Sequence, residues 1–387
     1  MKQFLLIAIL ILYSKAFSQS VEKSIIVKDI DTDLPIEDAT VSILASKQNF
    51  MSNTEGKVNF VIKKASSILV SHSSYLSITL RSISLKDEET IVYLKSNVNS
   101  LTDIIVTRKH PQKILKSLVE NSIKSLTVPA RLKVYAREFF KLNGDYTYYN
   151  DGLLNFQLTG TSINLENKIL VEQNRSYGLI DSQNDAEFLG YNLNNIMDNY
   201  YNFKYLAPLL EPKAKKEYDY ILQTYSANND YFMIVATPKD NVDGLKDDFV
   251  IIYDTQKKII IEVSSDISPL RISKNIENTA VGSKNIYKSS FKTIYRCENL
   301  NYYLVSSREE IGYERVDKNK TTDVDIKNCL VTTNFSTKNY TYKNCDVYKD
   351  KTLFCKKNKI LTDYWNESGL TATDEELQII ERIEFEK

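Results

Sequence analysis

Short runs of β-branched and aromatic residues, separated by turn residues, follow one another through most of this 387-residue chain. The chain has 26 Tyr and 15 Phe, and both residue types favour strands. Runs joined by short turns predict antiparallel neighbours, so we expect a large antiparallel sheet, either a half-barrel or a sheet packed onto a helix. The ten strands expected in this sheet are residues 132–142, 146–160, 168–173, 218–225, 231–237, 248–254, 258–264, 290–297, 301–311 and 324–334.

The first part of the chain has the same pattern on a smaller scale. Short apolar runs between residues 21 and 107 are separated by turn signals such as Asn53-Thr54-Glu55-Gly56. Val41 and Ile43 alternate with less apolar neighbours, which gives a strand one buried face. Several short strands at this spacing are typical of a small β-sandwich, so residues 19–107 are predicted to form one.

Two segments at the boundaries have helical periodicity instead. Apolar residues recur at i, i+4, i+8 and i+11 over residues 111–126, which predicts an amphipathic helix within a linker at 108–130. A capping-box pattern before an apolar stripe predicts a C-terminal helix at about residues 373–385. The larger β-rich domain is therefore expected to cover residues 131–387.

A third helical pattern interrupts the strands at about residues 192–210. Its apolar residues recur at i, i+3, i+4 and i+7, and Pro208 should end or kink the helix. Two interpretations of this inserted helix are open: its apolar face completes the core, or it forms a lid over an apolar cavity in the sheet and binds a ligand. The candidate ligand-binding residues are Leu193, Ile196, Met197, Tyr200, Phe203 and Leu206.

The first eighteen residues are predicted to be a secretory signal peptide. Lys2 precedes an apolar core at residues 4–13, and small residues follow, so cleavage is expected between Ser18 and Gln19. No later stretch approaches 18 uninterrupted apolar residues, and we therefore expect no transmembrane helix in the mature chain. The expected location is the periplasm or the outer membrane of the cell envelope.

Composition excludes several classes of site. The chain has only 10 Gly, widely spaced, which excludes the dinucleotide-binding fingerprint, the P-loop and the nucleophile elbow. The 2 His lie 38 positions apart, at His72 and His110, which excludes HExxH zinc sites. With 50 basic and 50 acidic side chains there is no positive field for nucleic acid. We expect no catalytic, cofactor-binding or metal-binding residues and no nucleic-acid partner.

Cysteines occur only in the last hundred residues. Their spacings match no zinc or redox motif, whereas an even number in an oxidising compartment favours disulfides, with three possible connectivities. Cys345 and Cys355 are nearest in sequence and are the candidate pair; buried reduced thiols are the alternative.

The N-terminal segment carries a family resemblance. The ordered motif consists of Ile26-Val27-Lys28-Asp29, Leu34-Pro35-Ile36, Ala39-Thr40-Val41, Asn53-Thr54-Glu55-Gly56-Lys57-Val58, His72-Ser73-Ser74-Tyr75 and Leu101-Thr102-Asp103-Ile104-Ile105-Val106. Over residues 24–107 it resembles the carboxypeptidase-regulatory-like domain, which is widespread in exported proteins of the Bacteroidetes. The resemblance implies a transthyretin- or Ig-like sandwich that acts as a non-catalytic scaffold or adaptor. The stretch from Ile360 to Glu376 resembles the end of an unassigned domain often joined to it.

These features together predict a non-enzymatic, exported cell-envelope protein. Its expected partner is an apolar or lipid ligand or an outer-membrane protein, and the expected arrangement of the large sheet is similar to the half-barrel that carries lipoproteins to the outer membrane. Two alternatives remain: a hydrolase that uses carboxylates on envelope polysaccharide or peptidoglycan, and a structural adaptor for an outer-membrane receptor.

Overall fold

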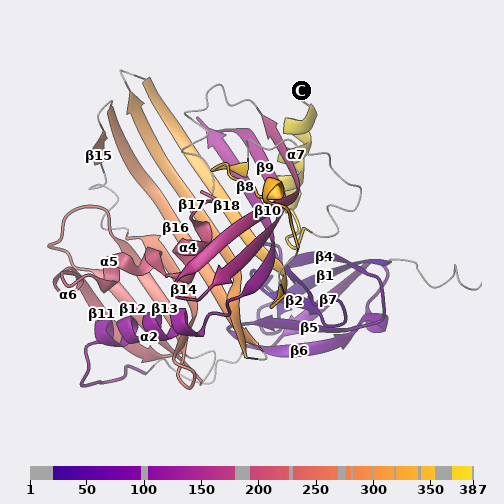
Figure 1. Cartoon of the computed structure of the whole chain (residues 1–387), viewed down its shortest axis with the longest axis horizontal. Helices are drawn as coiled ribbons and strands as arrows, with labels where there is room; N and C mark the ends of the chain where they lie inside the picture. Colours follow the sequence, from indigo (N-terminus) through magenta and orange to yellow (C-terminus); the bar gives the residue numbers. More distant parts are fainter. Residues whose placement is uncertain are drawn as a thin grey trace, which may run out of the picture. The chain divides into compact units, whose positions relative to one another are not determined.

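Figure 1 shows the computed structural model of the chain, which divides into two compact units. The first unit contains the residues up to Ser96 together with Trp365–Thr373, and the second unit contains the rest. The structure describes residues 21–96, 103–178, 192–225, 230–268, 276–279, 282–298, 300–317, 320–338, 341–353 and 368–385. The expected signal peptide lies outside these residues.

The first unit is a β-sandwich of two sheets. One sheet has the strand order β4-β1-β7 and the other β3-β2-β5-β6, and β1 pairs with β7 in parallel. Alternate residues such as Ile25, Val41 and Phe60 are buried between the sheets, as the two-residue period requires. The strands are β1 (Val21–Asp29), β2 (Thr40–Ile43), β3 (Gln48–Met51), β4 (Lys57–Ile62), β5 (Ser67–His72), β6 (Tyr75–Arg81) and β7 (Glu89–Leu94).

A segment from near the end of the chain belongs to this sandwich. The Met51 backbone N–H donates to the Gly369 carbonyl at 2.8 Å, and Met51 forms a parallel bridge with Leu370. The Asn59 N–H donates to the Thr371 hydroxyl at 2.7 Å. The domain boundaries expected from the sequence differ here, because residues 131–387 were assigned to the second domain as one block.

The second unit is built on one eleven-stranded sheet, and the mainly β fold is confirmed. Ten strands follow the order β10-β9-β8-β18-β17-β16-β14-β13-β12-β11, β15 pairs with β16, and every pair is antiparallel. The sheet is open, with β10 and β11 at its edges. The strands are β8 (Ala130–Leu142), β9 (Asp145–Gly160), β10 (Leu165–Gly178), β11 (Tyr218–Thr224), β12 (Tyr231–Pro238), β13 (Asp247–Asp254), β14 (Ile259–Ile267), β15 (Ile276–Thr279), β16 (Gly282–Glu298), β17 (Asn301–Asp317) and β18 (Lys320–Ser336).

The first helix after the sandwich is part of the second unit. The predicted helix is present as α2 (Pro111–Ser125), and Leu115 and Leu118 are buried in the same core as the sheet. The Ser122 hydroxyl accepts from the Ile260 N–H of β14 at 2.9 Å. Within the linker expected at 108–130, the apolar face of α2 therefore packs on the sheet of the second unit.

The inserted segment is a chain of short helices rather than one helix. It consists of α4 (Ile196–Tyr201), the 3₁₀ turn η2 (Lys204–Leu206), α5 (Ala207–Leu210) and α6 (Ala214–Glu217). Phe203 has a left-handed backbone with φ of 51°, which ends α4, and Pro208 lies in the first turn of α5. The predicted continuous helix at 192–210 is wrong in this respect, although its apolar residues do reach the core.

The C-terminal helix α7 (Asp374–Phe385) is present as predicted and contacts β9 and β10. Glu376 on its first turn pairs with Arg137 of β8 and with Lys327 of β18, each at 3.0 Å. Arg137 points to the opposite face of β8 from Ala136, which belongs to the core that α2 and α4 share. The sheet is therefore covered by helices on both faces.

A buried charge cluster lies on the α7 face of the sheet. Arg175 of β10 donates to both oxygens of Asp151 at 2.9 and 3.1 Å and to the Tyr149 hydroxyl at 2.9 Å. The hydroxyls of Tyr135 and Tyr149 donate to the same carboxylate. Asp151 is 0% exposed, and its carboxylate accepts hydrogen bonds from all three side chains.

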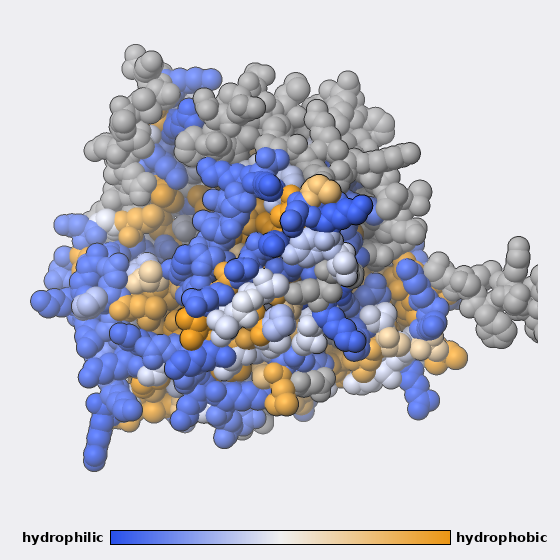
Figure 2. Space-filling model, in the orientation of Figure 1, coloured by the Kyte–Doolittle hydropathy of each residue, from blue (hydrophilic) through white to orange (hydrophobic). Residues whose placement is uncertain are grey.

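No helix among the described residues is long and apolar enough to cross a membrane. Figure 2 shows that hydrophobic residues on the visible face occur in small groups between hydrophilic ones. Large apolar side chains are instead gathered in the core, where Phe156, Leu304 and Leu330 are fully buried.

Candidate binding pocket

The six candidate ligand-binding residues of the inserted segment are all buried. Each is at most 3% exposed and belongs to the large core. Of the six, Ile196 and Tyr200 also line a cavity that lies between the inserted segment and the sheet. The structure thus brings the six predicted residues together in the core, and two of them line this cavity while the other four do not.

We call this cavity the inner pocket. It has a volume of about 370 Å³, within the range of small-molecule sites. Its walls come from α4 and η2 on one side and from β16 and β17 on the other. The lining residues are Asn192, Asn195, Ile196, Asn199, Tyr200, Lys204, Tyr205, Phe291 and Glu309.

Three aromatic rings form the apolar part of the inner pocket. The Phe291 ring lies 4.7 Å from the Tyr205 ring and 6.4 Å from the Tyr200 ring, centroid to centroid. The Tyr205 and Tyr295 hydroxyls are 2.9 Å apart, and the Tyr295 hydroxyl donates to the Tyr200 carbonyl at 2.7 Å. These bonds hold the rings in fixed positions, so the pocket offers a preformed ring surface.

Glu309 is the acidic group of the inner pocket. It lies on β17 between Phe291 of β16 and Asn328 of β18, and the Asn328 amide donates to its carboxylate. Burial raises the pKa of Glu309, an effect that the bond from Asn328 partly offsets. Among the described residues, no cation contributes to this pKa.

The charged lysine that also lines the inner pocket is already paired. Its ammonium pairs with Asp198, six residues earlier in the inserted segment, in an ion pair that is exposed to solvent. Glu310, the neighbour of Glu309, faces the other side of β17 and pairs with Lys288 at 2.6 Å. Glu309 thus differs from the other charged groups nearby in having no described ionic partner.

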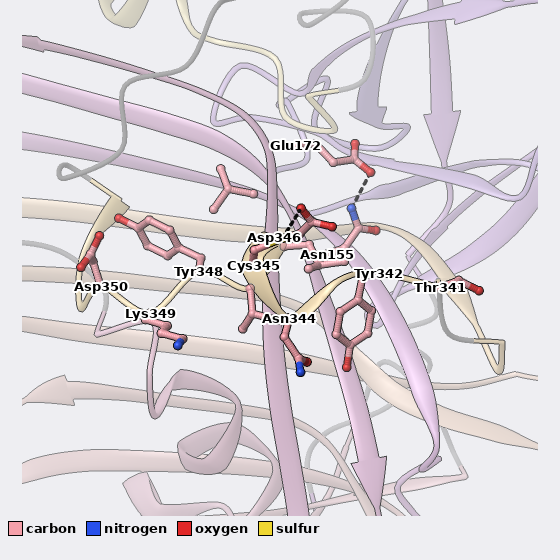
Figure 3. A pocket seen from close by; sticks show the side chains of 13 residues that line it. Asn155, Glu172, Thr341, Tyr342, Asn344, Cys345, Asp346, Tyr348, Lys349 and Asp350 are labelled. Carbon is pink, nitrogen blue, oxygen red and sulfur yellow. Dashed lines mark hydrogen bonds between the residues drawn. The ribbon is translucent and has the colours of Figure 1, made fainter.

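A second, more polar cavity lies at the β10 edge, and we call it the edge pocket (Figure 3). It has a volume of about 920 Å³ and lies between β10 and residues 341–350. Tyr348 bridges Ile169 of β10, and Asn155 donates to Glu172 across the floor. Tyr342 also lines this pocket (Figure 3), and the Lys168 ammonium lies 5.9 Å from the centre of its ring. The edge pocket has no comparable cluster of rings.

The cysteine prediction remains open. Cys345 is exposed and lines the edge pocket, whereas Cys355 lies outside the described residues. The pair therefore stays a prediction. Within the described part of the chain, no three His, Cys, Asp or Glu side chains are grouped to hold a metal ion.

Sequence reasoning missed Phe291 and Glu309 as pocket residues. Both lie in strands that were predicted, but their meeting depends on strand register. One signal was available: the adjacent Glu309 and Glu310 must point to opposite faces of a strand, so one of them had to face the core side. The tyrosine-rich run at residues 200–205 was the other signal.

Comparisons with known proteins leave the family of this chain undefined. No family model matches the chain, and no curated protein matches it. A solved structure titled "Lipid-protein interactions in lipovitellin" is similar over 56% of this chain at 9% sequence identity, with a TM-score of 0.27. The similar region covers 26% of that protein's chain. The resemblance to the carboxypeptidase-regulatory-like domain stays a prediction.

Proposed function

We propose that this chain is an exported, non-enzymatic binding protein of the cell envelope, whose inner pocket takes a small ligand with an apolar body. The observation that carries the proposal is the preformed ring surface of Tyr200, Tyr205 and Phe291 on the face of a large sheet. The pocket combines this ring surface with polar side chains from the inserted segment and β17, and an apolar surface with placed polar groups beside it is a common form of small-molecule site.

Export is supported by the N-terminal residues. Lys2, the apolar residues 4–13 and the small residues before Gln19 have the order of a signal peptide. N-terminal sequencing of protein from the envelope fraction should begin at Gln19. A sequence that begins at Met1 would contradict export by this route.

Ligand binding is tested with Nile red, a neutral apolar fluorophore, and the purified full chain. Nile red fluorescence should increase to a plateau as protein is added. Phe291→Ala should weaken this binding about tenfold because a ring contact is lost. The matched control is Tyr342→Ala, which removes a ring from the edge pocket and should leave binding unchanged. Thermal unfolding followed by circular dichroism is used to check that both variants are folded.

Two results would overturn the proposal. One is the absence of saturable Nile red binding to the wild-type chain. The other is loss of binding in Tyr342→Ala with normal binding in Phe291→Ala, since this would assign the ligand to the edge pocket. The hydrolase and adaptor alternatives stay predictions from the sequence.

A further inference from the structure

Glu309 is the last member of a row of polar side chains that crosses the sheet on its inner-pocket face. Register places Asn150 opposite Glu138, Glu138 opposite Asn328, and Asn328 opposite Glu309. The Asn150 amide donates to Glu138 at 2.8 Å, and the Asn328 amide donates to Glu309. Each carboxylate is therefore oriented by a neighbouring amide.

The last carboxylate of this row, Glu309, lines the inner pocket. Glu138 is 4% exposed and is not part of the pocket lining, whereas Glu309 lines the inner pocket beside Phe291. Burying a carboxylate is unfavourable unless a cation or several donors accompany it. Within the described residues, the donor to Glu309 is one amide, which leaves acceptor positions directed at the cavity.

The groups around this carboxylate suit a positive charge. Phe291, Tyr200 and Tyr205 present ring surfaces, and ring faces attract organic cations. The ammonium of Lys204 pairs with Asp198, and both side chains are more than 40% exposed, so this ion pair lies toward solvent. A fatty-acid carboxylate, by contrast, would meet Glu309 as a like charge.

We propose that the ligand carries an organic ammonium group, with Glu309 as its counter-ion and the rings of Tyr205 and Phe291 in contact with its apolar body. This inference rests on the proposed function and adds the chemical class of the ligand. The ammonium is either that of a free amine or the headgroup of an aminolipid.

Displacement of Nile red by three octyl compounds tests the inference. At pH 8, octylamine is protonated, octanol is neutral and octanoate is negative, while the chain length is constant. Octylamine should displace Nile red at a concentration at least about tenfold lower than octanol, because a charge-assisted hydrogen bond forms only with the ammonium. Octanoate should be the weakest of the three.

Two variants separate the charge effect from a change in folding. Glu309→Gln keeps the size of the side chain but removes its charge, so the octylamine and octanol concentrations that displace Nile red should become similar, whatever the affinity of the variant for Nile red itself. Glu310→Gln is the matched control, because it changes the same type of residue on the opposite face and should keep the preference.

A pH series gives an independent readout. The preference for octylamine should decrease when Glu309 is protonated at low pH, and Glu310→Gln should show the same decrease because it keeps Glu309. The other ionisable or charged groups that face this part of the pocket are Tyr200, Tyr205 and the Lys204–Asp198 pair.

The two sources of an ammonium differ in a transfer experiment. Vesicles of phosphatidylcholine that contain a fluorescent phosphatidylethanolamine should lose the label to the protein if the ligand is an aminolipid. Octylamine preference without lipid transfer assigns a free amine, and both outcomes support the ammonium. If Nile red binds but the three octyl compounds displace it equally, the ammonium inference is overturned while the proposed function stands; if Nile red does not bind, the proposed function fails first.

Discussion

Replacing Arg175 with methionine should destabilise the larger unit strongly. Arg175 makes two hydrogen bonds to Asp151, at 2.9 and 3.1 Å, and Asp151 is 0% exposed. Methionine fills a similar space but removes the charge, so Asp151 keeps only hydroxyl donors from Tyr135 and Tyr149. The variant then contains a buried carboxylate without the guanidinium that hydrogen-bonds to it directly, and the remaining guanidinium of the cluster, Arg137, donates to the Tyr135 hydroxyl instead.

The magnitude follows from the burial of the pair. Removing one partner of a buried ion pair costs about 3–5 kcal/mol, whereas an exposed pair contributes about 0–1 kcal/mol. Lys213→Met is the control, because Lys213 pairs with Glu211 at 3.2 Å and both side chains are at least half exposed. Urea denaturation followed by circular dichroism should show the large loss only for Arg175→Met.

A double-mutant cycle tests the cause of the loss. Asp151→Asn alone should also destabilise, because it leaves the guanidinium of Arg175 without its counter-charge. The double variant removes both charges, so it should be more stable than the sum of the two single losses predicts, by about 2 kcal/mol or more. Additive losses, or a cost for Arg175→Met no larger than that of Lys213→Met, would refute the reasoning.

Three further predictions concern other parts of the chain. Burial, together with Asp266 and Asp248, raises the pKa of Asp247 to about 6, so ionisation of Asp247 opposes folding increasingly between about pH 4 and 6. Asp247→Asn should therefore raise the free energy of unfolding by about 1–3 kcal/mol above pH 6 and change it little near pH 4. Equal effects at both pH values would contradict this. Phe203→Ala should cost about 3–5 kcal/mol in the same denaturation assay, since Phe203 is 0% exposed, and a loss below about 1 kcal/mol would mean that its ring is not core. Cys345 and Cys355 should resist alkylation without reductant, and an intact mass with four alkylated thiols would rule out the bridge.

The strands of the larger sheet were predictable because their signal is strong and local. All ten predicted strands are present, and each contains alternating aromatic or β-branched residues. The strand of this sheet that the sequence did not predict, β15, has four residues, which is too short for a repeating pattern. The inserted segment has helical spacing in its sequence, but spacing alone does not show that Phe203 adopts a left-handed backbone.

The meeting of Phe291 and Glu309 in the inner pocket could not be predicted from the sequence, because it depends on a β-bulge. The turn at residues 298–301 pairs Glu298 with Asn301, and a regular hairpin from this point would pair Phe291 with Arg308. A bulge between Ile294 and Tyr295 shifts the register by one residue, so Phe291 lies opposite Glu309 instead. Because a shift of one residue exchanges the faces of a strand, the bulge decides which charged side chain enters the pocket.

The participation of residues 368–373 in the first sandwich has a consequence for the order in which the molecule can assemble. The bond between Asn59 and Thr371 joins positions 312 residues apart, and the whole β-sheet of the larger unit lies between them in the sequence. During synthesis or export from the N-terminus, the residues of all seven strands emerge early, but the segment that completes the sandwich emerges only with the last part of the chain. Closing so long a loop costs conformational entropy, and the cost falls once the intervening unit has folded and shortened the gap. The first unit to appear is thus the last to be finished, and a chain interrupted before residue 368 would carry a sandwich with Met51 and Asn59 lacking these partners.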